Sequence, residues 1–177
     1  MTCRTALTIA ALSPLLAYAG GQGKANRASP HETVSVDVDA KKITISYGRP
    51  YLKGREVGNE VAPYGQVWRL GADEATKITI PSPMTLGGSI QLAPGSYSLF
   101  AVPQADKWTL IVNKVADQWG AFKYQKSEDV GRVDLPTKLL STPVEQFTIT
   151  LDKQSSNTAT LTLAWGKTSV STELRTR

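Results

Sequence analysis

Charged and aromatic residues are concentrated in one long connection early in the chain, between positions 47 and 76. They are Arg49, Lys53, Arg55, Tyr64, Trp68, Arg69, Asp73 and Glu74. Guanidinium groups bind carboxylates and phosphates through paired hydrogen bonds, and tryptophan rings pack flat against other rings. We therefore predict a binding site in this connection, for a small anionic or carbohydrate-like ligand or for a partner protein of the cell envelope.

The first half of this connection carries three cations, Arg49, Lys53 and Arg55. Cations held this close in a loop repel one another unless carboxylates or a bound anion lie among them. Glu56 and Glu60 could provide the negative charge, which would make the group structural. If Arg49 and Arg55 instead converge with Arg69, an acidic ligand becomes the better explanation. The sequence leaves both interpretations open.

The second half of the connection contains the pairs Trp68-Arg69 and Asp73-Glu74. In an extended segment, neighbouring side chains point to opposite faces, so Trp68 can enter the core while Arg69 faces solvent. Arg69 then either pairs with Asp73 or Glu74 and holds the loop, or contacts a ligand. A rival function is a carboxylate-dependent envelope hydrolase that uses Asp73 or Glu74 as acid or base. From an extended strand, these two adjacent carboxylates cannot both face one substrate.

A second aromatic group follows at Trp119, Phe122 and Tyr124, interleaved with Lys123. If these rings form a contiguous exposed patch, they provide a platform on which sugar rings or peptide side chains can stack. The alternative is that Trp119 and Phe122 close the open end of the hydrophobic core. We include Trp119 and Tyr124 among the candidate ligand-binding residues.

The sequence predicts no catalytic residue, no metal ligand and no cofactor. Its single histidine, His31, follows Pro30 near the N-terminus and is poorly placed to act as a general base or metal ligand. Without a second histidine or a cysteine beyond Cys3, a transition-metal site is not expected. A non-enzymatic binding module is therefore the favoured function, ahead of the hydrolase and of a purely structural adaptor.

The elements that must position these residues are strands, because apolar residues alternate with a period of two and β-branched residues are frequent. Nine or ten short strands are predicted, at 34–38, 43–47, 76–80, 84–86, 89–92, 96–102, 108–113, 147–151, 158–165 and 169–174. Gly87-Gly88 is the clearest hairpin turn. We predict an all-β domain, a two-sheet sandwich or alternatively a squat barrel, with one irregular excursion near 115–140.

The N-terminus reads as a secretory signal at residues 1–19, with Arg4 before an apolar run and a small-x-small cleavage site that ends at Ala19. Residues 20–31 are predicted to be a disordered lead-in, and residues 32–177 a single β domain. The chain has a net charge of +5 and no predicted membrane span. These features predict a secreted or periplasmic protein that does not bind nucleic acid.

Four ordered phrases carry a resemblance to a known family. They are GRP at 48–50 with KGR at 53–55, PYGQVWRLGADEAT at 63–76, PGSYSLF at 94–100 and DQWGAFKY at 117–124. Together they resemble the secreted bacterial domain-of-unknown-function family numbered twenty-nine eleven, over nearly all of the chain from Thr33 to Val170. The resemblance implies an exported all-β domain and brings no catalytic assignment. Asp73 stands where that family usually has Asn, which replaces two donors by a charge.

Overall fold

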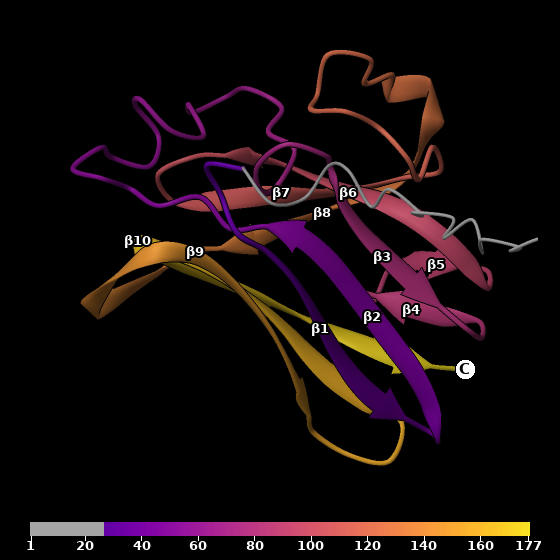
Figure 1. Ribbon diagram of the computed structural model, residues 1–177. Helices are drawn as coiled ribbons and strands as arrows, with labels where there is room; N and C mark the ends of the chain where they lie inside the picture. The colour runs from indigo at the N-terminus through magenta and orange to yellow at the C-terminus, as the bar shows by residue number, and fades with distance from the viewer. Residues whose placement is uncertain (1–26) are drawn as a thin grey trace, which may run out of the picture.

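The computed structural model describes residues 27–177, which contain ten strands and one short 3-10 helix (Figure 1). In chain order they are β1 (His31–Val38), β2 (Lys41–Gly48), β3 (Thr76–Ile80), β4 (Met84–Leu86), β5 (Ile90–Leu92), β6 (Gly95–Pro103), β7 (Lys107–Asn113), η1 (Lys126–Glu128), β8 (Asp129–Pro136), β9 (Lys138–Lys153) and β10 (Thr158–Thr176). The predicted signal peptide, its cleavage site and most of the predicted lead-in lie outside the described residues. Nothing helical within residues 27–177 has the length and apolar character that a membrane crossing requires.

The strands form two antiparallel sheets. One has six strands in the order β1-β2-β3-β6-β7-β8, and the other has four in the order β5-β4-β10-β9. The edge strands β1 and β9 belong to different sheets and contact each other, as do the edge strands β5 and β8. Neither contact is a hydrogen-bonded ladder. The prediction of an all-β two-sheet fold is therefore confirmed, and the alternative of a squat barrel is wrong because the sheets do not close.

Two tight turns set the register of the early strands. The β1–β2 hairpin turns at Asp39-Ala40, where both residues have positive φ, 52° and 55°. A turn with two positive φ values matches the right-handed twist of the flanking strands. The register it sets pairs Val38 with Lys41 and brings His31 opposite Gly48. The predicted turn at Gly87-Gly88 joins β4 to β5, and both glycines have positive φ.

The later strands differ from the predicted ones in length. The excursion near 115–140 is irregular up to η1 and then continues as β8, an edge strand that pairs with β7. The two strands predicted at 158–165 and 169–174 are one strand, β10, whose pairing with β9 shifts register around Gly166. Gly166 has a φ of 59°, a left-handed value that glycine adopts readily and that is found at bulges in continuous strands.

The hydrophobic core lies between the two sheets. Fully buried members include Ile45, Ile78, Leu99 and Leu110 of the six-stranded sheet and Phe147, Leu161, Leu163 and Trp165 of the four-stranded sheet. Burial of each such side chain stabilises a fold by about 1.5–3 kcal/mol. The two long irregular segments, 49–75 and 114–128, follow β2 and β7, and Figure 1 shows both on the same side of the molecule.

Candidate functional site

Trp68 fixes the second half of the long connection to the core. Its ring stacks on Trp165, with centroids 5.4 Å apart and an interplanar angle of 16°, and meets the ring of Trp108 edge-on at 5.8 Å. Its backbone exchanges two hydrogen bonds with Ala101, of 2.8 and 2.9 Å. These contacts fit the interpretation of Trp68 as a core anchor.

The chain then turns sharply before β3. Leu70 and Asp73 both have positive φ, 55° and 63°, and the Thr76 hydroxyl donates to the Leu70 carbonyl over 2.6 Å. Aspartate tolerates this left-handed conformation better than most residues. Because Asp73 is not extended, the alternation of side chains is broken at that position.

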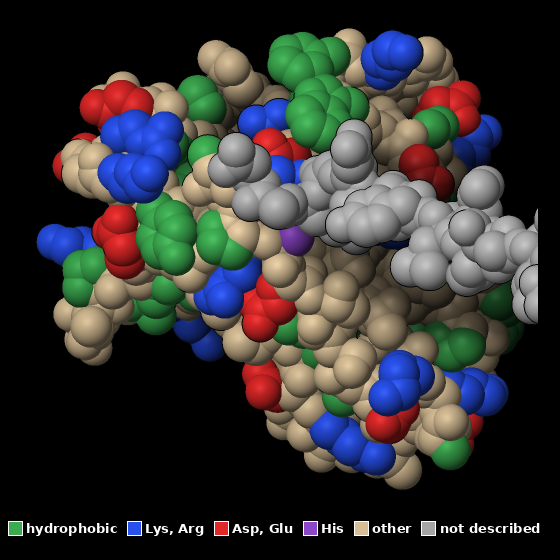
Figure 2. Space-filling model, in the orientation of Figure 1, with side chains coloured by type: hydrophobic (Ala, Val, Ile, Leu, Met, Phe, Trp, Pro, Cys, Tyr) green, Lys and Arg blue, Asp and Glu red, His purple; other side chains and the backbone are tan. Residues whose placement is uncertain are grey.

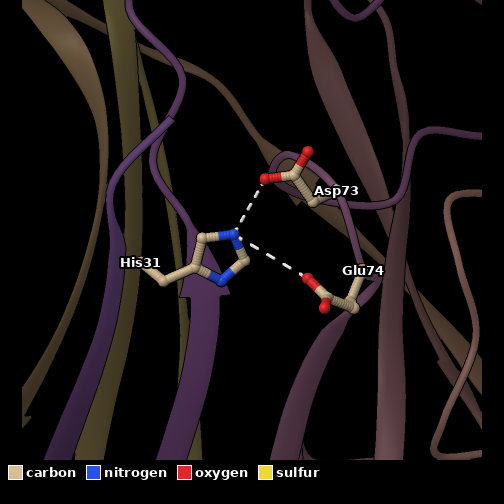
Figure 3. A group of neighbouring side chains, drawn as sticks. All are labelled: His31, Asp73 and Glu74. Carbon is tan, nitrogen blue, oxygen red and sulfur yellow. Dashed lines mark hydrogen bonds and ion pairs between the residues drawn. The ribbon is translucent and has the colours of Figure 1, made fainter. Parts of the chain in front are cut away.

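Asp73 and Glu74 consequently approach the same imidazole ring (Figure 3). The Nε2 atom of His31 lies 2.9 Å from Asp73 Oδ2 and 3.8 Å from Glu74 Oε2. The restriction that applies to an extended strand does not apply here, because Asp73 has a positive φ. His31 opens β1, so the cluster joins the start of the first strand to the loop before the third.

Arg27 completes this cluster from the segment that precedes β1. Its two terminal nitrogens donate to the two carboxylate oxygens of Glu74 over 2.5 and 2.7 Å. These hydrogen bonds lower the pKa of Glu74 and raise the pKa of Arg27. Glu74 is therefore held as a carboxylate. The guanidinium carbon also lies 6.0 Å from the centre of the Trp119 ring, within range of a cation–π contact.

The second irregular segment pairs with this loop. The Ala75 N–H donates to the Gln118 carbonyl and the Gly120 N–H donates to the Asp73 carbonyl, each over 2.9 Å. These two bonds flank an isolated antiparallel bridge between Glu74 and Trp119. The residues around Trp119 are thereby fixed beside the carboxylates, although about 45 positions separate the two segments in the sequence.

A groove of about 670 Å³ opens between these segments and the ends of β1 and β2. Its lining includes Arg27, His31, Thr33, Ser46, Glu74, Lys77, Asp117, Gln118 and Trp119. A second hollow of about 540 Å³ shares Asp117, Gln118 and Trp119 with the first and adds Phe122 and Lys123. The segment 117–119 therefore stands between two adjoining depressions of the surface.

The charges of the groove are internally paired. Lys77 lies 3.0 Å from Asp117, and Arg27 holds Glu74 as described above. Glu32, at the groove's strand β1 wall, lies 3.0 Å from Arg49. On the face drawn in Figure 2, basic and acidic side chains are likewise mixed and do not form a patch of one sign.

The arginines of the first half of the connection contact different parts of the molecule. Arg49 donates to the Phe147 carbonyl over 3.2 Å and to the Thr148 hydroxyl over 3.0 Å, in addition to pairing with Glu32. Arg55 donates to two carbonyl groups of its own loop, over 2.9 and 2.8 Å. Arg49 therefore ties the connection to β9, whereas Arg55 stabilises the turn in which it lies.

Neither predicted acid neutralises these arginines by a direct contact. Glu60 instead accepts a hydrogen bond from the Glu56 N–H over 3.0 Å, which lowers its pKa. Lys53 is exposed, and its backbone N–H donates to Glu145 over 2.8 Å. This segment is thus held by hydrogen bonds within the loop and to β9, and by the burial of Val61 and Ala62 in the core.

The Arg69 side chain does not join the cluster of His31, Asp73 and Glu74. Its guanidinium donates to the Asp73 carbonyl over 3.5 Å, and a Cβ added at Gly120 would lie 3.1 Å from it. The carboxylates of Asp73 and Glu74 are directed to His31 and Arg27 instead. Arg69 therefore contacts the backbone of its own loop and lies close to Gly120 of the second irregular segment.

The second aromatic group divides into two kinds of side chain. Trp119 and Phe122 are 58% and 84% exposed, so they do not close the core. Tyr124 packs against Phe100 with centroids 5.0 Å apart, and its hydroxyl donates to Asp129 over 2.7 Å. Burial and this hydrogen bond raise the pKa of Tyr124 to about 12. Tyr124 therefore supports the fold, while Trp119 faces the groove.

Sequence reasoning missed Arg27 and His31 as members of the site. One signal was available for His31: extending the hairpin register back from Val38 and Lys41 brings it opposite Gly48, where the long connection begins. No local pattern indicates that Asp73 returns to that point. The approach of Asp73 to His31 depends on tertiary contacts, among them the packing of Trp68 against the core.

The fold and the groove together define a class, an open two-sheet antiparallel β domain with a polar, aromatic-walled surface groove. The chain belongs to the family described as a protein of unknown function (DUF2911), which matches residues 29–174. This confirms the resemblance carried by the four phrases of the sequence. Neither a curated protein nor a solved structure matches the chain.

Proposed function

We propose that this protein is an exported, non-enzymatic binding protein for an uncharged carbohydrate-like ligand. The single observation that carries the proposal is the position of Trp119, which is 58% exposed and forms part of the wall of a groove of about 670 Å³. A volume of this size falls in the range of small-molecule sites. An exposed indole offers an apolar face with a polar edge, which suits a sugar ring.

The polar side chains near Trp119 are already ordered by contacts within the protein. The Gln118 amide donates to Ser98, Asn113 and Val115 over 2.9–3.2 Å. The hydroxyl groups of Thr33 and Ser46 lie 2.8 Å apart. Groups fixed in this way bind a hydroxylated ligand with a smaller loss of conformational entropy.

The internal pairing of charges favours a neutral ligand over an anionic one. An anion that reached Arg27 or Lys77 would have to displace Glu74 or Asp117, and it would meet those carboxylates at close range. Like charges brought together in a binding site are unfavourable. A neutral saccharide can accept and donate hydrogen bonds beside these pairs without breaking them.

A screen of saccharides tests this proposal. Thermal shift measurements with neutral and acidic mono- and disaccharides should show stabilisation by one or more neutral members. Acidic sugars of the same ring type should bind more weakly, because the groove cations are paired. Binding confined to acidic sugars, or to none of the panel, would contradict the proposal.

The hydrolase remains a second candidate because His31, Asp73 and Glu74 converge at the edge of the groove. Arg27 holds Glu74 ionised, so Glu74 could act as a base or stabilise positive charge but not donate a proton. Turnover of glycosides, esters or peptides that is lost in both Asp73→Asn and Glu74→Gln would favour this candidate. Turnover that survives both changes would exclude it.

A further inference from the structure

Three side chains from two separate segments direct potential metal ligands at one point (Figure 3). His31, Asp73 and Glu74 each offer one atom, and these three atoms lie within 4.8 Å of one another. Their side chains are 30%, 29% and 44% exposed, so an ion in solution can reach them. One imidazole nitrogen with two carboxylate oxygens is a ligand set that first-row divalent metals accept.

The protein already directs a cationic group at this point. The Nη1 atom of Arg27 lies 2.5 Å from Glu74 Oε2, 2.9 Å from His31 Nε2 and 4.0 Å from Asp73 Oδ2. It therefore hydrogen-bonds two of the atoms that would ligate a metal and lies within ion-pair distance of the third. A site that holds a guanidinium nitrogen in this way has the negative potential that a divalent cation also needs.

The contacts of the His31 ring cannot all be satisfied by the protein alone. Nε2 lies 2.9 Å from Arg27 Nη1, which can only donate, and 2.9 Å from Asp73 Oδ2, which as a carboxylate can only accept. A single ring nitrogen carries either a proton or a lone pair. It cannot accept from Arg27 and donate to Asp73 at once, so one of these contacts is always unfavourable.

A bound metal ion removes this conflict. The ion would take the Nε2 lone pair and one oxygen from each carboxylate, leaving further coordination positions open toward solvent or a ligand in the groove. We propose that His31, Asp73 and Glu74 form a binding site for a divalent transition metal such as Zn²⁺, and that Arg27 competes with the ion for the same atoms. This inference goes beyond the proposed saccharide binding and departs from the sequence-based expectation of no metal ligand.

Titration of the full chain with Zn²⁺ tests the site. The Cys3→Ser background is used throughout, so that the only cysteine of the chain does not bind the ion. Calorimetry at neutral pH should show one Zn²⁺ per chain. His31 is the only histidine, so its ring gives the only imidazole signals in a nitrogen-correlated NMR spectrum, and these should shift as the single equivalent binds.

Variants identify the ligands. His31→Gln, Asp73→Asn and Glu74→Gln should each weaken Zn²⁺ binding by at least about tenfold, as loss of a contact to a metal does. Asp117→Asn is the matched control, because this groove carboxylate pairs with Lys77 outside the cluster, and its affinity should be unchanged. Melting curves in the presence of a chelator establish that each variant folds.

Arg27→Ala tests the competition. Removing an exposed ion pair of this kind should tighten Zn²⁺ binding by about two- to fivefold. Lys77→Ala, which removes a groove cation outside the cluster, should change the affinity less. Weaker binding by Arg27→Ala would overturn the competition. Absence of stoichiometric binding, unshifted His31 signals in the wild-type chain, or full affinity in His31→Gln would overturn the site itself.

Discussion

Tyr47 connects the two sheets through its hydroxyl group. Its oxygen accepts the Ile149 N–H of β9 over 2.9 Å, and its proton is donated to Glu32 of β1 over 3.0 Å. The ring meets Phe147 edge-on at 5.7 Å. Burial raises the pKa of Tyr47 to about 12, from an ordinary value of 10.0. One side chain thus links the end of β2 to the facing sheet at the groove's wall.

Tyr47→Phe should destabilise the protein by about 1–3 kcal/mol at neutral pH, because the buried Ile149 N–H loses its acceptor. Urea unfolding measures this loss. Tyr124→Phe is the comparison, since the hydroxyl of Tyr124 bonds to the side chains of Asp129 and Arg132 and not to the backbone of the facing sheet. A Tyr47→Phe variant as stable as the parent would contradict the linking role.

The raised pKa of Tyr47 predicts that the protein loses stability at alkaline pH. The unfolded chain releases the Tyr47 proton near pH 10 and the folded chain only near pH 12, so the folded state binds more protons between these values. The contribution of protonated Tyr47 to the free energy of unfolding is therefore complete below pH 10, and it declines as the pH rises toward 12. Unfolding measured across this range should show a shallower decline in Tyr47→Phe. A decline as steep as that of the parent would contradict the assignment.

Individual residues also show how much of the site could be predicted from the sequence. Trp119 and Glu74 were recognisable as candidates, because exposed aromatics and loop carboxylates are common in binding sites. Arg49 and Arg55 were candidates for the same reason, yet they bind β9 and their own loop. His31 has no local pattern that marks it as part of a site, and the sequence places it only beside Pro30 near the N-terminus. A side chain's partners depend on distant segments, and local composition does not contain that information.

At the scale of elements, the groove depends on the pairing of two irregular segments. Both lack the alternation that identifies strands, so the sequence predicts that they are loops but not that they hydrogen-bond to each other. By contrast, β1 to β5 could be predicted because alternate side chains in them are buried. β6 and β7 bury runs of consecutive residues, and the aromatic and β-branched residues in them indicate strands. The edge strand β8 has one fully buried residue, Leu135, and for that reason its pattern was weak.

Gly166 allows β10 to continue as one strand past a bulge. Gly166→Ala should destabilise the protein by about 1–2 kcal/mol, because a φ of 59° is costly for a residue with a Cβ. The added methyl group would lie 3.5 Å from Val57, an ordinary contact, so the loss comes from the backbone. Gly166→Asn should lose less, because asparagine tolerates this conformation. Equal stability of all three proteins in urea would contradict the bulge.

At the scale of the whole molecule, the two sheets enclose the main core, a smaller buried cluster forms around Phe100 and Ile111, and the groove lies at the surface of the protein. The order of the strands within each sheet could not be predicted. Alternation of apolar residues identifies a strand but does not indicate which other strands it pairs with. The family match supports the resemblance and carries no activity. The proposed function and the proposed metal site therefore rest on the groove and on the cluster at its edge.

Export is a prediction about the whole chain that residues 27–177 do not test. Expressed in a bacterium from its full sequence, the protein should leave the cytoplasm and begin at Gly20, because the predicted signal sequence ends at Ala19. N-terminal sequencing of the fractionated protein measures this. A chain that lacks residues 1–19 should stay in the cytoplasm. Recovery of the full-length chain there with Met1 intact would contradict export.

The most direct test of the central claim is a calorimetric titration of a neutral saccharide from the screen into two variants. Trp119→Ala should weaken binding by about 5- to 150-fold, as loss of a stacking contact of about 1–3 kcal/mol does. Phe122→Ala, which removes a more exposed ring that lines only the second hollow, should bind as the parent does. Unchanged affinity in Trp119→Ala, with the fold intact, would contradict the account.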